Sequence, residues 1–235
     1  IYTLLPLLNS VVGKHFCQIL CPSFKYETGY IGQIPLIEYN SDITKKKCIQ
    51  NISISKQDWN SHENSWDFQE NELISIHKRF PRDMNGITVT INDTPIDISL
   101  PNTLQYIYNK YVVKWKELFI QLHCNEEELN RQFIEIYGLQ DELTPDVPLE
   151  EITILQQGEI TIKDNEITFN ADVIMKQFIS YAVGCWMGRY RLDRPGLQIA
   201  HPNPTEEETA PYSYNGEEFT IDDDAIIPFM SRDCA

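Results

Sequence analysis

The chain has 235 residues, of which 42% are hydrophobic and 11% aromatic, and its formal net charge is −16. This length and composition suffice for one or two ordinary hydrophobic cores. No run approaches the roughly 18 apolar residues that a transmembrane helix needs, and no secretory signal opens the chain, so we expect a cytoplasmic protein without a membrane partner. Because the first residue is Ile1 rather than Met, we expect a fragment of a larger multidomain protein.

The charge is unevenly distributed along the chain. Residues 1–120 contain 12 Lys or Arg and 12 Asp or Glu, whereas residues 121–235 contain 7 and 23. The second half would repel a phosphate backbone, so any direct contact with nucleic acid is expected in the first half. The alternative is that these charges only keep a protein surface solvated.

Apolar residues at three- and four-residue steps predict an amphipathic helix over residues 1–22, with Pro6 disturbing its start. Residues 30–35 are expected to be extended, because Pro35 keeps the residue before it out of the helical region. Residues 42–53 predict a second helix, and a third is expected to begin near Ser55. Trp59 is interpreted as a packing residue.

The middle of the chain predicts a hairpin followed by two helices. Residues 86–98 alternate between apolar and polar side chains around a turn, which is typical of an exposed hairpin. A helix is expected over residues 102–123. Asn125 is expected to cap a second helix, with Glu126 and Glu127 near its positive end, and Gly138 is expected to end it.

The last third predicts a short strand at residues 152–155, a hairpin at residues 160–169 and a helix at residues 171–190. That helix is apolar on nearly all sides and is therefore expected to be buried, with Gly184 allowing another element to come close. The remaining residues are expected to form an acidic, irregular tail. The fold class is thus α+β, a mainly helical scaffold with one or two small antiparallel β-hairpins.

The residue types that usually carry catalysis or bind metals lack the necessary spacing. The six cysteines include no pair separated by two residues, and the five histidines include no close pair. No glycine-rich phosphate-binding loop is present. Asp222, Asp223 and Asp224 lack the lysine that a metal-dependent nuclease site would need. We therefore expect no catalytic, cofactor-binding or metal-binding residue in this chain.

Four segments resemble one protein family, in the family's order. They are residues 50–68 (QNISISKQDWNSHENSWDF), 125–145, 179–197 and 224–228. The sequence is similar there to PglX-type methyltransferases, the large adenine-specific DNA methyltransferases of BREX phage-defence systems. Residues 7–13 and 29–36 resemble the closing helix and strand of target-recognition domains. The hairpin has no counterpart in the family pattern and is interpreted as an insertion near residues 82–100.

The resemblance implies a parent protein that uses S-adenosylmethionine and flips adenine out of double-stranded DNA. Such an enzyme needs a polar-Pro-Pro-aromatic loop and a glycine-containing cofactor turn, and neither is present, so no family active-site residue can be transferred. The expected organisation is the end of a target-recognition-like domain (1–40), a helical scaffold (41–150), and a hairpin, buried helix and acidic tail (151–235).

The resemblance favours a non-catalytic C-terminal or linker portion that braces the recognition and methyltransferase lobes. An acidic protein–protein interaction module and the scaffold of a fused restriction–modification endonuclease remain as alternatives. Other defence-system proteins are possible partners. From the charge distribution, the candidate nucleic-acid contacts are the lysines of the first half, Lys14, Lys25, Lys45, Lys46, Lys47 and Lys56.

Overall fold

The computed structural model describes residues 2, 4–21, 28–37, 39, 42–79, 88–91, 94–97, 104–221 and 226–227, and for residues 88–97 the backbone alone. The chain forms two compact units that are each built from separated stretches of sequence. Unit 1 comprises Ile1–Lys56, Trp115–Ile154 and Asp164–Glu166, and unit 2 comprises Gln57–Lys114, Leu155–Lys163 and Ile167–Ala235. The helices α4 and α6 contribute residues to both units.

Unit 1 begins with two short helices where the sequence predicts one. Helix α1 spans Leu4–Asn9 and α2 spans Val11–Leu20. Ser10 separates them, and its hydroxyl caps α2 by accepting a hydrogen bond of 3.2 Å from the Gly13 amide. A Cβ atom at Gly13 would lie only 2.3 Å from the Leu7 carbonyl oxygen, so this corner requires glycine.

The extended segment expected at residues 30–35 begins instead with a helical turn, α3 at Thr28–Ile31. Proline restricts only the residue directly before it. Pro35 therefore constrains Ile34 and leaves residues 28–31 free to form the turn. The prediction was wrong because it extended a one-residue effect over five residues.

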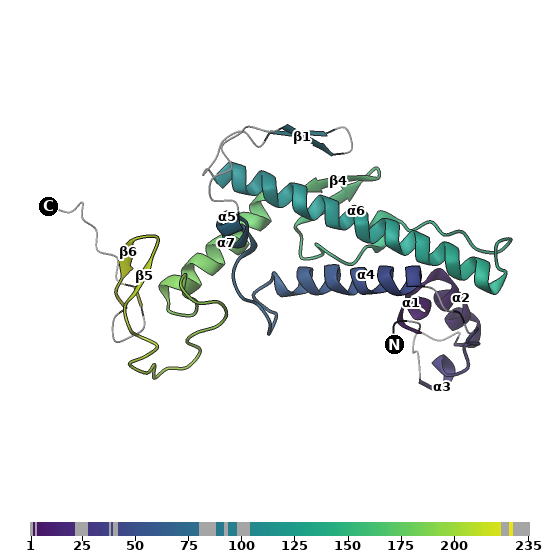
Figure 1. Cartoon of the computed structure of the whole chain (residues 1–235), viewed down its shortest axis with the longest axis horizontal. Helices are drawn as coiled ribbons and strands as arrows, with labels where there is room; N and C mark the ends of the chain where they lie inside the picture. The colour runs from purple at the N-terminus through teal and green to yellow at the C-terminus, as the bar shows by residue number, and fades with distance from the viewer. Residues whose placement is uncertain are drawn as a thin grey trace. The chain divides into compact units, whose positions relative to one another are not determined.

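Two predicted helix breaks are absent. Helix α4 runs without interruption over Asp42–Asn60, and α6, the longest helix (Figure 1), runs over Leu104–Tyr137. The expected cap, Asn125, lies inside α6 and is fully buried. Its amide oxygen accepts hydrogen bonds from Lys47 (3.1 Å) and Gln121 (2.9 Å), and its amide nitrogen donates to Asn51 (2.9 Å). A side chain occupied by these partners does not compete with the helix backbone.

The end of α6 is confirmed at the predicted glycine. Gly138 has a φ of +67°, its amide donates to the Glu135 carbonyl, and the Leu139 amide donates to the Ile134 carbonyl. This pattern is the Schellman motif. The core of unit 1 combines α1, α2, α6 and the segment after α3, through the buried residues Leu7, Val12, Ile34, Leu129, Phe133 and Ile134.

Three two-stranded sheets lie in the described part of the chain, and they confirm the expected α+β class with small hairpins. Strands β1 (Thr88–Ile91) and β2 (Thr94–Asp97) are antiparallel, with Thr88 opposite Asp97. Their turn residues, 92–93, lie outside the described residues. Strands β3 (Ile160–Lys163) and β4 (Glu166–Phe169) are joined by Asp164 and Asn165, both with positive φ, as in a type I′ turn.

The strand expected at residues 152–155 does not form. A 3₁₀ turn, η1, spans Leu149–Glu151, and Leu155 has a φ of +59°, which no strand residue adopts. Ile152, Ile154 and Leu155 are nevertheless buried. The apolar residues of this segment therefore indicated burial correctly, whereas the prediction that the segment forms a strand was wrong.

Unit 2 also contains α5 (Glu72–Arg79) and α7 (Ala171–Trp186). Tyr181 and Cys185 of α7 pack with Phe68 and Tyr190 in a buried cluster. The expectation that α7 is apolar and buried on all sides holds for this face only. Its other face is exposed, with relative exposures of 59% for Ile179 and 43% for Trp186.

The acidic tail contains a hairpin that the sequence analysis did not predict. Strand β5 spans Tyr212–Tyr214 and β6 spans Glu217–Phe219. The buried guanidinium of Arg191 lies over the Tyr212 ring, 4.3 Å from its centroid, and donates to the Ala210 carbonyl at 3.0 Å. These contacts order the tail through cation–π attraction and a charge-assisted hydrogen bond.

Candidate functional site

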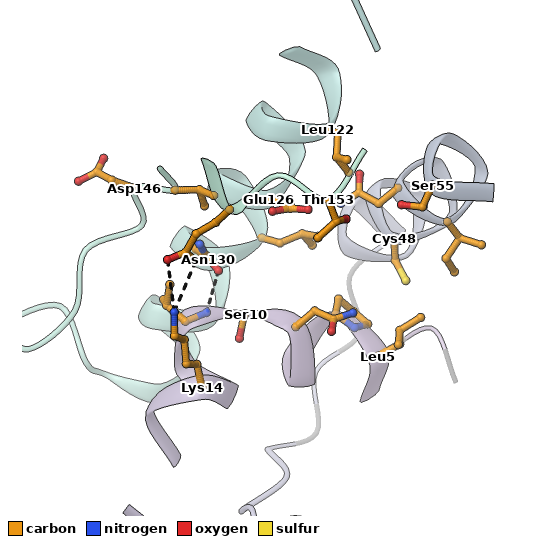
Figure 2. Close-up of a pocket in the computed structure, with 18 residues that line it drawn as sticks. Leu5, Ser10, Lys14, Cys48, Ser55, Leu122, Glu126, Asn130, Asp146 and Thr153 are labelled. Carbon is orange, nitrogen blue, oxygen red and sulfur yellow. Dashed lines mark hydrogen bonds and ion pairs between the residues drawn. The ribbon is translucent and has the colours of Figure 1, made fainter. Parts of the chain in front are cut away.

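A cavity of about 460 Å³ lies within unit 1 (Figure 2). Its wall is formed by α1, α2, α4, α6 and the segment around η1. Helix α6 contributes Leu122, Glu126 and Leu129, and α4 contributes Cys48, Asn51, Ile52 and Ser55. These sets follow three- and four-residue steps, so each presents one helix face to the cavity.

The cavity wall is held in shape by Asn130, which is 4% exposed. Its amide oxygen accepts a hydrogen bond from the Val11 amide at 3.0 Å, and its amide nitrogen donates to the Pro145 carbonyl at 3.1 Å. One side chain thus connects α6 to α2 and to the segment that follows α6. Sequence reasoning missed Asn130, because an asparagine inside a helix gives no sign of distant partners.

Glu126 is the half-buried charge of the cavity. Burial raises the pKa of its carboxyl group, the nearby Glu151 raises it further, and His123 opposes the rise. The side chain of Glu126 makes no hydrogen bond or ion pair within the described residues. Lys14 also lines the cavity, but it pairs with Glu151 at 3.4 Å. The sequence predicts Glu126 in the first turn of a helix, and this prediction was wrong because α6 continues through that position.

The candidate lysines do not form one cluster. Lys45, Lys46 and Lys56 are exposed on α4, whereas Lys47 is partly buried and donates to Asn125. Lys45 and Lys56 are eleven residues apart, which places them on one side of the helix, about 16 Å apart at 1.5 Å per residue. Lys14 lies on α2 beside Glu151, and Lys25 lies outside the described residues.

Unit 2 contains a buried ionic network that the sequence analysis did not find. His62 Nε2 lies 2.6 Å from Glu159, and the exposures of the two side chains are 6% and 0%. His62 Nδ1 lies 2.8 Å from the Asp58 carbonyl oxygen. With an acceptor at each ring nitrogen, the imidazole must donate twice and is therefore cationic.

Further donors complete the network around Glu159. Gln177 donates to its carboxylate at 2.6 Å and the Gln157 amide donates at 2.9 Å. The Asp58 carboxylate accepts from the Leu155 amide at 3.0 Å, which stabilises the unusual backbone of Leu155. The His62–Glu159 pair at its centre is closed to solvent and hydrogen-bonded on all sides, so its geometry suits a structural role.

Neither a metal centre nor a membrane helix is indicated in the described ranges. They contain no group of three or more His, Cys, Asp or Glu side chains arranged to hold a metal ion. None of their helices combines the length and apolar character needed to cross a bilayer.

Two curated proteins are similar to this chain. The adenine-specific methyltransferase PglX of Lacticaseibacillus casei (strain Zhang) is 32% identical over 196 residues, covering 83% of the chain and 14% of the relative. The adenine-specific methyltransferase BrxX of Escherichia coli O9:H4 (strain HS) is 31% identical over 237 residues, covering 98% of the chain and 17% of the relative. No protein-family model matches the chain.

The class of protein that the chain resembles is therefore the adenine-specific methyltransferases. Within that class, the similarity to the PglX type is confirmed over most of the chain. The chain spans about one sixth of the length of the curated relatives that it matches.

Proposed function

We propose that this chain is a non-catalytic portion of a site-specific N6-adenine DNA methyltransferase that acts in phage defence. The observation that carries the proposal is the similarity of this chain to two adenine-specific methyltransferases. The matches cover 83% and 98% of the chain and 14% and 17% of the two relatives. The sequence contains no adenine-binding loop and no glycine-containing cofactor turn. S-adenosylmethionine and the catalytic residues are then supplied by the rest of the parent protein.

Its role in that protein is to brace the recognition and methyltransferase lobes. The support is architectural: long helices with buried polar contacts, such as those of Asn125 and Asn130, suit a rigid scaffold. In this proposal, residues 1–40 are the end of a target-recognition-like domain, residues 41–150 are the helical scaffold with a hairpin insertion, and residues 151–235 are a hairpin, a helix and an acidic tail.

The exposed side of α4 is the proposed surface for direct contact with double-stranded DNA. Lys45 and Lys46 are exposed and make no ion pair within the described residues, and Lys56 lies three helical turns further on the same side as Lys45. A row of cations at this spacing can contact phosphate groups. Lys47 is a weaker candidate because it donates to Asn125, and Lys14 is weaker because it pairs with Glu151.

A salt titration of DNA binding tests this contact. Binding of a fluorescent duplex to the chain is measured for the wild type, for the Lys45→Ala/Lys46→Ala variant and for a control, Lys163→Ala/Lys176→Ala, which removes the same charge from the acidic half. Each lost phosphate contact lowers the log–log salt slope by about 0.9. We expect a fall of about 1.8 for the α4 variant and an unchanged slope for the control.

The charge of residues 121–235 supports a second candidate function, docking of a basic protein partner. The same titration separates the two functions. Equal slopes for the wild type and the α4 variant, or no salt-dependent binding of DNA, would contradict the DNA contact. The acidic half would then be the surface to test against basic proteins of the same defence system.

A further inference from the structure

We propose that the cavity of unit 1 is a binding site for an organic cation, an ammonium or amidinium group on an apolar body, with Glu126 as the residue that receives its charge. This site is separate from the proposed DNA contact, and the two can fail independently. The proposal depends on the size of the cavity, the charges that line it and the placement of its polar and apolar groups.

The cavity is too large to be a packing defect. Its volume of about 460 Å³ lies within the range of roughly 300–1,000 Å³ that is typical of small-molecule sites. The space opens to solvent, since Leu5, Lys14 and Ser55 of its lining are exposed. Asn130 and the Ser10 cap hold the surrounding elements in fixed positions, so the space is part of the folded structure.

The charges in the lining favour a cation. Three carboxylates, those of Glu126, Asp146 and Glu151, line the cavity together with one cation, Lys14. Lys14 pairs with Glu151, and His123, whose charge acts on Glu126, also lies 3.4 Å from Glu127 and 2.7 Å from the Val147 carbonyl oxygen. Burial of the Glu126 carboxylate carries a desolvation cost, and a bound cation would reduce that cost. An anionic ligand would increase it.

The arrangement of polar and apolar side chains in the cavity lining indicates which kind of cation fits there. Glu126 lies between Leu122 and Leu129 on one face of α6, so the carboxylate is flanked by apolar side chains. Figure 2 shows the Glu126 side chain beside Thr153 within the group of lining residues. A small inorganic cation would leave Leu5 and Ile52, the exposed large apolar side chains of the lining, in contact with water, whereas a cation with an apolar body can cover them.

Calorimetry with benzamidine tests the proposal on the intact chain. Benzamidine combines an amidinium group with an apolar ring, and benzamide is its neutral counterpart. We expect saturable benzamidine binding, with benzamide at least tenfold weaker, because a charge-assisted hydrogen bond to the carboxylate is lost. Binding of both compounds with equal affinity, or no saturable binding at millimolar benzamidine, would overturn the proposal.

Two matched variants assign the charge to Glu126. Glu126→Gln keeps the shape of the side chain, and Glu135→Gln removes the same charge from an exposed position of α6 that does not line the cavity. We expect at least tenfold weaker benzamidine binding for the first variant and unchanged binding for the second. Ser55→Phe, a change at an exposed lining residue, should abolish binding by filling the space. Equal affinities of the wild type and either cavity variant, with circular dichroism showing each folded, would place the ligand elsewhere.

Discussion

At the scale of single residues, the main feature of this chain is the buried pair of His62 and Glu159. Removing two charges from water is costly, and the cost is recovered only when the geometry is good and the remaining polar atoms are satisfied. Here the carboxylate accepts from His62, Gln177 and the Gln157 amide, and the imidazole contacts the Asp58 carbonyl. The pair therefore connects the end of α4, the segment before β3 and α7 within unit 2.

Glu159→Ala should lower the free energy of unfolding by about 3–5 kcal/mol, because it removes the carboxylate that is in contact with the buried His62 imidazolium. Chemical denaturation monitored by circular dichroism measures this change. The matched control is Glu166→Ala, an exposed glutamate of β4, which should change stability by less than about 0.5 kcal/mol. Similar small effects of both substitutions would show that the pair contributes no net stability.

The same pair should make stability depend on pH. Burial lowers the pKa of His62, but the hydrogen bond and charge of Glu159 outweigh burial and raise it above 6.5. The contribution of His62 is then complete below about pH 6.5 and disappears as the pH rises through the folded-state pKa. Burial raises the pKa of Glu159, but the His62 and Gln177 hydrogen bonds outweigh it and lower the pKa below 4.5. The contribution of Glu159 is present above about pH 4.5 and disappears as the pH falls through its folded-state pKa.

Denaturation curves at a series of pH values should therefore show the largest contribution of the pair between about pH 4.5 and 6.5. His62→Gln, which keeps hydrogen-bonding groups but cannot be charged, should remove the loss of stability on the alkaline side. A wild-type stability that stays constant as the pH rises above about 6.5 would contradict the charged state assigned to His62.

At the scale of secondary-structure elements, glycine decides how the helices end. Gly188 follows α7 with a φ of +68°, and the Arg189 amide donates to the Gly184 carbonyl at 2.8 Å. The chain then folds back so that the Tyr190 ring covers Gly184. The same motif at Gly138 ends α6. In both helices, the glycine allows the left-handed backbone that lets the next segment pack against the last turn.

Gly184→Ala should destabilise the chain by about 1–3 kcal/mol, because the added Cβ would lie 2.6 Å from the Tyr190 ring. The increase in helix propensity from glycine to alanine, about 1 kcal/mol, acts in the opposite direction and makes the test stringent. Thermal melting compares this variant with Val183→Leu, which enlarges an exposed neighbour on the same helix. An equal or higher melting temperature for Gly184→Ala would show that Tyr190 can move away without cost.

At the scale of the whole molecule, the chain matches 14% and 17% of the length of its curated relatives, and the proposed non-catalytic role can be tested on the chain alone. S-adenosylmethionine requires a turn where the backbone approaches the cofactor closely, and that turn needs glycine after a strand. The sequence contains no such pattern. Calorimetry of the chain with S-adenosylmethionine should therefore show no saturable binding, and stoichiometric micromolar binding would refute the proposed non-catalytic role.

The similarity to PglX-type methyltransferases and the positions of the strongly patterned elements could be predicted from the sequence alone. Four blocks in family order indicated a PglX-type methyltransferase, and two curated relatives confirm the similarity. The hairpins at 88–97 and 160–169 and the end of α6 at Gly138 were predicted correctly, because alternation, turn residues and glycine caps act over a few neighbouring residues. The hairpin at Tyr212–Phe219 could also have been found, since Asn215-Gly216 is a strong turn signal.

Features that depend on residues distant in sequence could not be predicted and became visible only in the folded structure. Asn125 resembles a helix cap locally, but its side chain bonds to α4, so α6 continues through it. Glu126 resembles a residue of a helix first turn, but it lines a cavity with residues from α1, α2 and α4. His62 and Glu159 are 97 residues apart, and no local pattern relates them. Local rules act through neighbouring backbone atoms, whereas such burial and pairing exist only after distant segments have packed together.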